Sequence, residues 1–189
     1  MIETSVNTDG YEVAFRGHKY HFTARKFYDD KFSVQLPDSF VSMPEHVREI
    51  YQPGSHPGQV LLADDAGQLS FGLLKAEEKI DAAIMEKQVE LCKVVLPKMA
   101  AGVHVYEADI LDGVYQPIAY FEYINDGLLE RMYNCMFLTG LEGHMVWGSI
   151  SFSYNDRKLN ELAKEIACSC HDLTIDRDCT EEKENGYNK

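Results

Sequence analysis

The chain has 189 residues and a formal net charge of −13, from 31 acidic and 18 basic side chains. This length fits one domain with a short tail, and 45% hydrophobic residues suit a folded protein better than a disordered one. The acidic balance argues against binding to nucleic acid or to an anionic membrane, because both need clustered lysine and arginine.

A membrane span and an export signal are not expected either. The longest mostly apolar stretch, residues 118–124, is far shorter than the ~20 residues of a spanning helix and contains Glu122. The first residues lack a basic segment followed by an apolar one, so we expect a cytoplasmic protein. An odd number of scattered cysteines is typical of reduced thiols in that compartment. They are Cys92, Cys135, Cys168, Cys170 and Cys179.

The first part of the chain predicts short antiparallel strands. Glycine-containing turns bound the runs 11–16 and 20–27, and a strand over 32–37 ends at Pro37. Residues 43–58 are expected to form a loop that includes a helical turn. An Asp-Asp-Ala-Gly turn then separates the strands 59–63 and 68–74.

Two segments switch to helical spacing. Between about residues 76 and 96, apolar positions predict a buried stripe that includes Ile80, Ile84, Leu91 and Val95, and Pro97 and Gly102 end the helix. The second helix begins near residues 155 and 156 and ends near Cys170. Its apolar stripe consists of Leu159, Leu162, Ala163, Ile166 and Cys170.

Between the two helices, residues 103–154 alternate with the period of strands and contain three turns. This pattern predicts a meander of four strands. The whole order predicts an α+β fold, one antiparallel sheet with two amphipathic helices packed on it. We expect an N-terminal extension at 1–10, a single domain at 11–173 and an acidic, polar tail at 174–189.

The order of elements, joined to the sequence Phe-Ser-Val-Gln-Leu-Pro at 32–37 and the aromatic Phe40, resembles the Mog/PsbP/DcrB-like superfamily. The resemblance covers roughly residues 11–173 and implies an αβ sandwich. It also implies a non-catalytic role, because the family's members include an import factor, a photosystem accessory subunit and chaperones of secreted toxins. The family has no shared catalytic motif, so the resemblance assigns no site residues.

The cysteines and histidines allow two chemical hypotheses. Cys168, Cys170 and His171, with Cys179 nearby, carry ligand types that zinc prefers, while the alternative is that Cys170 is a small buried hydrophobe. A thiol–imidazole pair, Cys135 with His144 or Cys92 with His104, requires hydrogen-bond proximity, which the sequence does not establish. No phosphate-binding, dinucleotide-binding, zincin or hydrolase motif occurs, so we expect no cofactor.

The acidic charge gathers in the meander, where residues 103–150 contain seven acidic side chains and one basic one. This asymmetry predicts either a docking face for a basic partner or a surface that keeps the protein soluble. The candidate interaction face consists of Tyr106, Glu107, Asp109, Tyr120, Glu122 and Tyr123.

The sequence therefore favours a non-enzymatic protein-binding domain, an adaptor, a chaperone or an inhibitor of the immunity type. The alternative is a small-molecule or metal-binding protein, or a thiol-dependent enzyme using Cys135 and His144 or the Cys168, Cys170 and His171 cluster. The sequence does not determine the oligomeric state.

Overall fold

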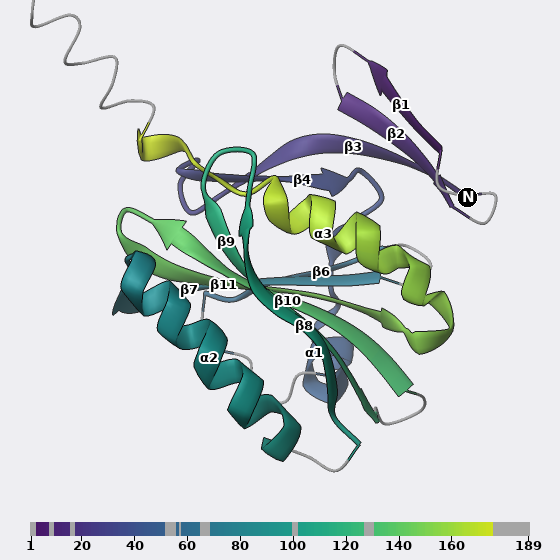
Figure 1. Ribbon diagram of the computed structural model, residues 1–189. Coiled ribbons are helices and arrows are strands. Elements are labelled where there is room, and N and C mark those ends of the chain that lie inside the picture. The colour runs from purple at the N-terminus through teal and green to yellow at the C-terminus, as the bar shows by residue number, and fades with distance from the viewer. Residues whose placement is uncertain are drawn as a thin grey trace, which may run out of the picture.

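The computed structural model describes residues 3–7, 10–15, 18–51, 56, 58–64, 69–99, 102–126 and 131–175 (Figure 1). Its strands form two antiparallel sheets. In spatial order, the smaller sheet contains β1 (Glu3–Asn7), β2 (Gly10–Phe15), β3 (His18–Phe27), β4 (Phe32–Pro37) and β12 (His171–Asp172). The larger contains β5 (Val41–Ser42), β6 (Val60–Ala63), β7 (Leu69–Lys79), β11 (His144–Ser153), β10 (Arg131–Leu141), β9 (Pro117–Asp126) and β8 (His104–Asp112).

The prediction of one sheet is therefore wrong, although the antiparallel character and the four-strand meander β8 to β11 are confirmed. The separation occurs at Pro37, the last residue of β4. Proline has no N–H for a further ladder bond, and the chain leaves the first sheet there to begin the second at Val41.

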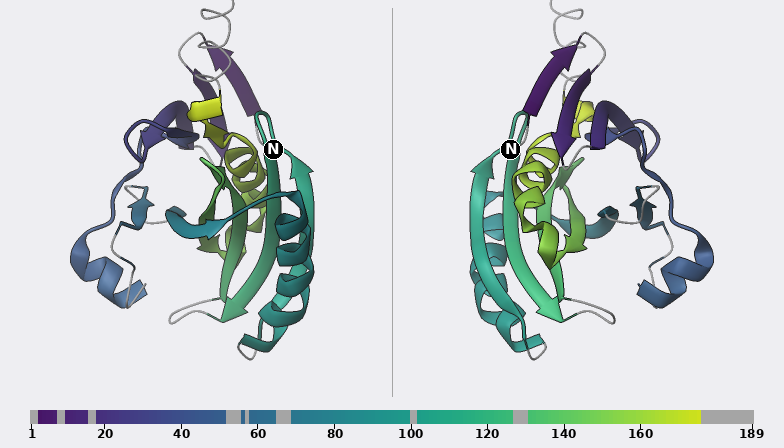
Figure 2. Two further views of the ribbon diagram at one scale, coloured as in Figure 1. Left: turned by 90° about the vertical axis from the view of Figure 1, so that its left-hand side faces the viewer. Right: turned by 90° about the vertical axis from the view of Figure 1, so that its right-hand side faces the viewer.

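The helices are α1 (Glu45–Tyr51), α2 (Ala82–Met99), the 3₁₀ helix η1 (Tyr154–Leu159) and α3 (Asn160–Cys168). α1 is the helical turn predicted within the loop 43–58. α2 and α3 lie on opposite faces of the larger sheet (Figure 2). α3 packs into the main core between the two sheets, and its predicted apolar stripe from Leu159 to Cys170 is buried there.

Helix α2 differs from its prediction in both start and rotation. β7 continues to Lys79 because it pairs there with β11, and the helix begins only after Asp81, whose carboxylate accepts a hydrogen bond from the Ile84 N–H at 2.8 Å. The buried side chains are Met85, Val89 and Leu96. Of the predicted stripe, Leu91 is 50% and Val95 40% exposed.

The positions of β7 and β8 in the sheet explain which strands α2 covers. It connects β7 to β8, and β11, β10 and β9 lie between those two strands. The helix therefore passes across the face of the sheet and buries a second, smaller core. That core includes Ala119, Phe121, Leu138 and Met145.

The domain boundaries at residues 11 and 173 remain predictions. β1 lies within the predicted extension and pairs with β2. Of the predicted tail, Thr174 and Ile175 belong to a helical turn, and residues 176–189 lie outside the described residues. Among the described residues, no helix is long and apolar enough to cross a membrane.

Candidate functional site

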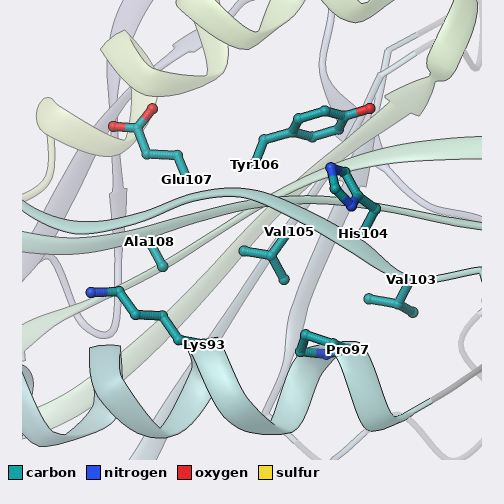
Figure 3. A pocket seen from close by; sticks show the side chains of 8 residues that line it. All are labelled: Lys93, Pro97, Val103, His104, Val105, Tyr106, Glu107 and Ala108. Atoms are coloured by element: carbon teal, nitrogen blue, oxygen red, sulfur yellow. The ribbon is translucent and has the colours of Figure 1, made fainter.

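Strand β8 is the last strand of the larger sheet, and a groove of about 400 Å³ runs along it beside α2 (Figure 3). β8 pairs with β9 on its inner side, and no other described strand pairs with it. Eight residues line the groove: Lys93, Pro97, Val103, His104, Val105, Tyr106, Glu107 and Ala108. The site therefore combines a sheet edge with one face of a helix.

A bulge in β8 directs side chains to both sides of this edge. The register with β9 shifts between Val105 and Glu107, so Tyr106 is the extra residue. Val105 and Ala108 point toward α2, whereas Tyr106 and Glu107 point to the other side (Figure 3). The bulge allows two consecutive residues, Tyr106 and Glu107, to share one side of the strand.

Tyr106 is the exposed end of an aromatic row. Its ring is 49% exposed, stacks on Tyr133 with 5.8 Å between centroids, and meets His104 edge-on at 4.7 Å. Tyr133 stacks in turn on Phe152 at 5.2 Å. A hydrogen bond with Tyr154 raises the pKa of Tyr106, so this ring remains a neutral, amphipathic surface at physiological pH.

The charges around the groove have both signs, whereas those of strand β8 itself are acidic. Glu107 accepts a hydrogen bond from Lys164 of α3 at 2.7 Å, and Lys93 binds Glu90 of its own helix at 2.7 Å. Each of these lysines is thus paired with one carboxylate. Asp109 and Asp112 are exposed on β8, and no basic side chain pairs with either among the described residues. They give the edge a net negative charge.

Beneath the edge lies a buried carboxylate. Glu122 is 4% exposed and accepts hydrogen bonds from the hydroxyls of Tyr120 at 3.0 Å and Tyr133 at 2.5 Å. Burial, together with the Glu122 carboxylate, raises the pKa of both tyrosines, which keeps them as donors. Cys135 faces Glu122 across the β9–β10 pair. Together, the hydrogen bonds of Glu122 link β9 to β10 behind the groove.

The predicted interaction face is thus divided by the fold. Tyr106, Glu107 and Asp109 lie together on β8, where Tyr106 and Asp109 are exposed and Glu107 is half-buried. Tyr120 and Glu122 are buried on the core side of β9. The sixth residue, Tyr123, is half-buried on the opposite face of β9, where its hydroxyl contacts the Met136 sulfur at 3.4 Å. The accessible part of the predicted face is the β8 edge.

The thiol–imidazole pairs are not brought together. In the β10–β11 hairpin, Cys135 faces Ile150 and Leu141 faces His144, which places Cys135 and His144 roughly 20 Å apart at about 3.3 Å per residue. Lys79 and the Glu77 carbonyl contact the His144 ring.

The second predicted pair, Cys92 with His104, is separated by strand β8. Cys92 packs in the core under α2, whereas the His104 ring lies against Tyr106, on the other side of β8. Burial raises the pKa of Cys92 as well as that of Cys135. Neither thiol is activated.

The Cys168, Cys170 and His171 cluster is also dispersed. Cys170 is fully buried in the main core, Cys168 is half-buried at the end of α3, and the His171 ring stacks on Tyr115 at 3.8 Å. Burial raises the pKa of both thiols. Within the described part of the chain, no three His, Cys, Asp or Glu side chains are placed to share a metal ion. Cys179 lies outside the described residues.

Sequence reasoning missed Lys93 and Pro97, which form the helical wall of the groove. Their spacing of four residues places them on one face of α2, but that face is polar and carries no signal of its own. The groove exists only because α2 returns to the sheet beside β8.

Comparison with known proteins identifies the fold. No protein-family model matches the chain, and no curated protein sequence does. It is similar to the Ran-binding protein Mog1p of Saccharomyces cerevisiae, with a TM-score of 0.54, 10% identity, and coverage of 82% of this chain and 96% of that one. It is also similar to the cyanobacterial PsbP of Synechocystis sp. PCC 6803, with a TM-score of 0.52, 13% identity, and coverage of 79% and 91%. The chain therefore has a Mog/PsbP-like fold, and the resemblance predicted from the sequence is confirmed.

Proposed function

We propose that this chain is a non-enzymatic, cytoplasmic protein-binding domain that holds a basic partner protein along the edge of β8. The observation that carries the proposal is the groove of about 400 Å³ between α2 and this edge. Its lining combines an exposed tyrosine, a lysine and a glutamate that are each paired with a residue outside the groove, and a strand edge. Protein interfaces favour such a mixture, because an aromatic anchor buries area while the polar rim sets orientation.

Two further observations support a binding role over catalysis. The described cysteines have raised pKa values, which is the opposite of what a nucleophilic thiol needs. In addition, Mog1p, which is similar in fold, is a Ran-binding protein. An adaptor, a chaperone or an inhibitor of a basic protein would each use such a surface.

Site-specific photocrosslinking tests the proposal. A benzophenone amino acid replaces Tyr106 in one variant and Val41 in a matched variant, and both proteins are irradiated in native lysate at low and moderate salt. Val41 is 55% exposed and lies on β5, at the opposite edge of the same sheet. Mass spectrometry identifies the products.

The expected result is one reproducible protein product at Tyr106 that is absent at Val41. Excess unlabelled wild-type protein should abolish this product, and a Tyr106→Ala protein with an unchanged melting temperature should compete at least tenfold less well. Identical products at both positions, or none at Tyr106, would contradict the proposal.

A further inference from the structure

We infer that the edge of β8 binds an extended, lysine- or arginine-rich segment of the partner as an additional strand of the larger sheet. The inference rests on the proposed function and specifies its mode of recognition. Four features of the edge support it. They are its regular ladder, the outward direction of its backbone N–H groups, the adjoining groove and the charge of its side chains.

The regular part of the edge follows the bulge. From residue 107 to residue 112, β8 pairs with β9 without a register shift. In such a ladder, the N–H and C=O groups of alternate residues point to opposite edges. One set therefore points away from β9, where no described strand lies.

A hydrogen bond identifies that outward set. The N–H of Ile110 donates to the carboxylate of Asp109 at 2.8 Å. A side chain thus occupies a donor that the β9 ladder does not use, so Ile110 belongs to the outward set, and Ala108 and Asp112 belong to it by the period of two. The pairing of Asp112 with Pro117 agrees, because proline has no N–H to give to a hydrogen-bonded pair.

The Asp109 carboxylate acts as a substitute for a partner's carbonyl. An incoming strand would accept from the Ile110 N–H with its own C=O and release Asp109 to contact one of its side chains. Main-chain hydrogen bonds of this kind give affinity without requiring a particular sequence, and side-chain contacts beside the edge give selectivity.

The groove continues the edge. It shares Glu107 and Ala108 with the regular ladder and extends to Val103. A segment that pairs with residues 108–112 therefore leaves the sheet at the bulge and enters the groove between Tyr106 and the Pro97 ring. The bulge limits pairing to one side of Tyr106, which prevents the whole of β8 from acting as an open template.

Charge determines which occupant fits. Asp109 and Asp112 have no basic partner among the described residues, and both border the regular edge. Side chains of lysine or arginine on an added strand would compensate them. A second copy of this chain, which has a net charge of −13 and the same acidic β8 edge, would place like charges opposite Asp109 and Asp112, and it is therefore disfavoured.

Three synthetic peptides test the mode of binding, each a blocked heptapeptide. The first is Thr-Lys-Val-Lys-Val-Lys-Thr, the second has glutamate in place of every lysine, and the third is the lysine peptide N-methylated at its third and fourth residues. The N-methyl groups leave the charge unchanged but remove donors from both edges of the peptide. Titration into isotope-labelled full-length protein is followed by amide chemical shifts and hydrogen exchange.

We expect the lysine peptide to shift and protect the amides of Ala108 and Ile110, and the other two peptides to bind at least tenfold more weakly. Ala108→Pro, which removes an outward N–H, should weaken the lysine peptide at least tenfold, whereas Val41→Ala, at the opposite edge of the same sheet, should leave its binding unchanged. Because proline can disturb folding, the double variant Asp109→Asn, Asp112→Asn provides a second test that leaves the backbone unchanged. It should weaken the lysine peptide at least threefold.

The alternative results are distinguishable. Equal binding of the N-methylated and unmodified lysine peptides would overturn strand addition, while a Tyr106 photocrosslink to one protein would still support the proposed function. Absence of peptide binding at β8 would overturn strand addition in the same way. A dimer in sedimentation experiments that Ala108→Pro converts to monomer would overturn the choice of a basic partner and identify a second copy as the occupant.

Discussion

The hydroxyl of Tyr133 donates a 2.5 Å hydrogen bond to the carboxylate of Glu122 in the interior of the protein, where the glutamate is 4% exposed. A buried carboxylate is tolerated only when it is hydrogen-bonded, and Tyr120 provides a second donor at 3.0 Å. The same Tyr133 ring supports Tyr106 at the groove. This pair therefore links the stability of the meander to the candidate binding edge.

Replacing Tyr133 by phenylalanine should destabilise the protein. The change removes one of two hydroxyl donors and leaves a Glu122 oxygen buried without it, which costs about 1.5–3 kcal/mol in the free energy of unfolding. Urea denaturation measures the effect. Tyr106→Phe is the matched control, because Tyr106 is 49% exposed and water can replace its hydrogen bond with Tyr154, so the change should cost less than about 0.5 kcal/mol. Equal costs in the two variants would contradict this interpretation.

The cysteines should resist alkylation in the native protein. Burial raises the pKa of all four described thiols, and Cys135 and Cys170 are fully buried. In a Cys179→Ser background, iodoacetamide at pH 7.5 should modify Cys135 and Cys170 only after unfolding, because the thiolate is the reactive form. Mass spectrometry over time measures each site, and glutathione supplies the reference rate. Native Cys135 reacting as fast as glutathione would revive the hypothesis of a thiol enzyme.

Glu142 should make stability depend on pH. Lys31 at 2.6 Å and Lys75 at 2.8 Å hold its pKa at about 2, below the ordinary value of 4.5. A lowered pKa in the folded state contributes stability above the unfolded value and loses it as the pH falls toward the folded one. Glu142→Gln should therefore lower the melting temperature most at pH 7, and the difference should shrink between pH 4.5 and 2.

The control for this prediction removes the two cations. In a Lys31→Met, Lys75→Met background, the melting-temperature difference caused by Glu142→Gln should no longer change with pH, because the coupling is absent. A difference that is constant with pH in the wild-type background would show that the two lysines do not hold this carboxylate.

Gly148 should be intolerant of any side chain. A Cβ at this position of β11 would overlap the Phe137 ring of β10, which is fully buried in the main core. Gly148→Ala should cost about 1–3 kcal/mol in the free energy of unfolding, the usual penalty of overpacking. Gly140→Ala is the control, since its Cβ would meet only Ile80 at 3.4 Å. Similar stability of the two variants in urea denaturation would refute the prediction.

Two valines of α2 test which way the helix is turned. Val89 is buried and Val94 is 54% exposed. Val89→Ala removes two buried methyl groups and leaves a small cavity, which should cost about 1.5–3 kcal/mol. Val94→Ala should lie within about 0.5 kcal/mol of wild type. Thermal and urea denaturation measure both, and the reverse order would support the rotation predicted from the sequence.

The sequence by itself determined most of the strands, the buried stripe of α3 and the likeness to the Mog/PsbP fold. Turns with glycine and aspartate fix where strands end, and the period of two in β11 places Val146, Ile150 and Phe152 together on one buried face. The stripe of α3 is likewise confirmed. These features are local, because each depends on residues within a few positions of one another.

Only the tertiary structure decided how the elements combine. Apolar residues occur on more than one side of α2, so the sequence allows either rotation, and contact with Phe121 and Leu138 selects the side of Val89. The groove has the same origin, since Pro97 of α2 and Tyr106 of β8 line it together only because the helix lies beside this edge of the sheet. Local periodicity defines the faces of an element, but which face is buried depends on free energy gained from residues distant in sequence.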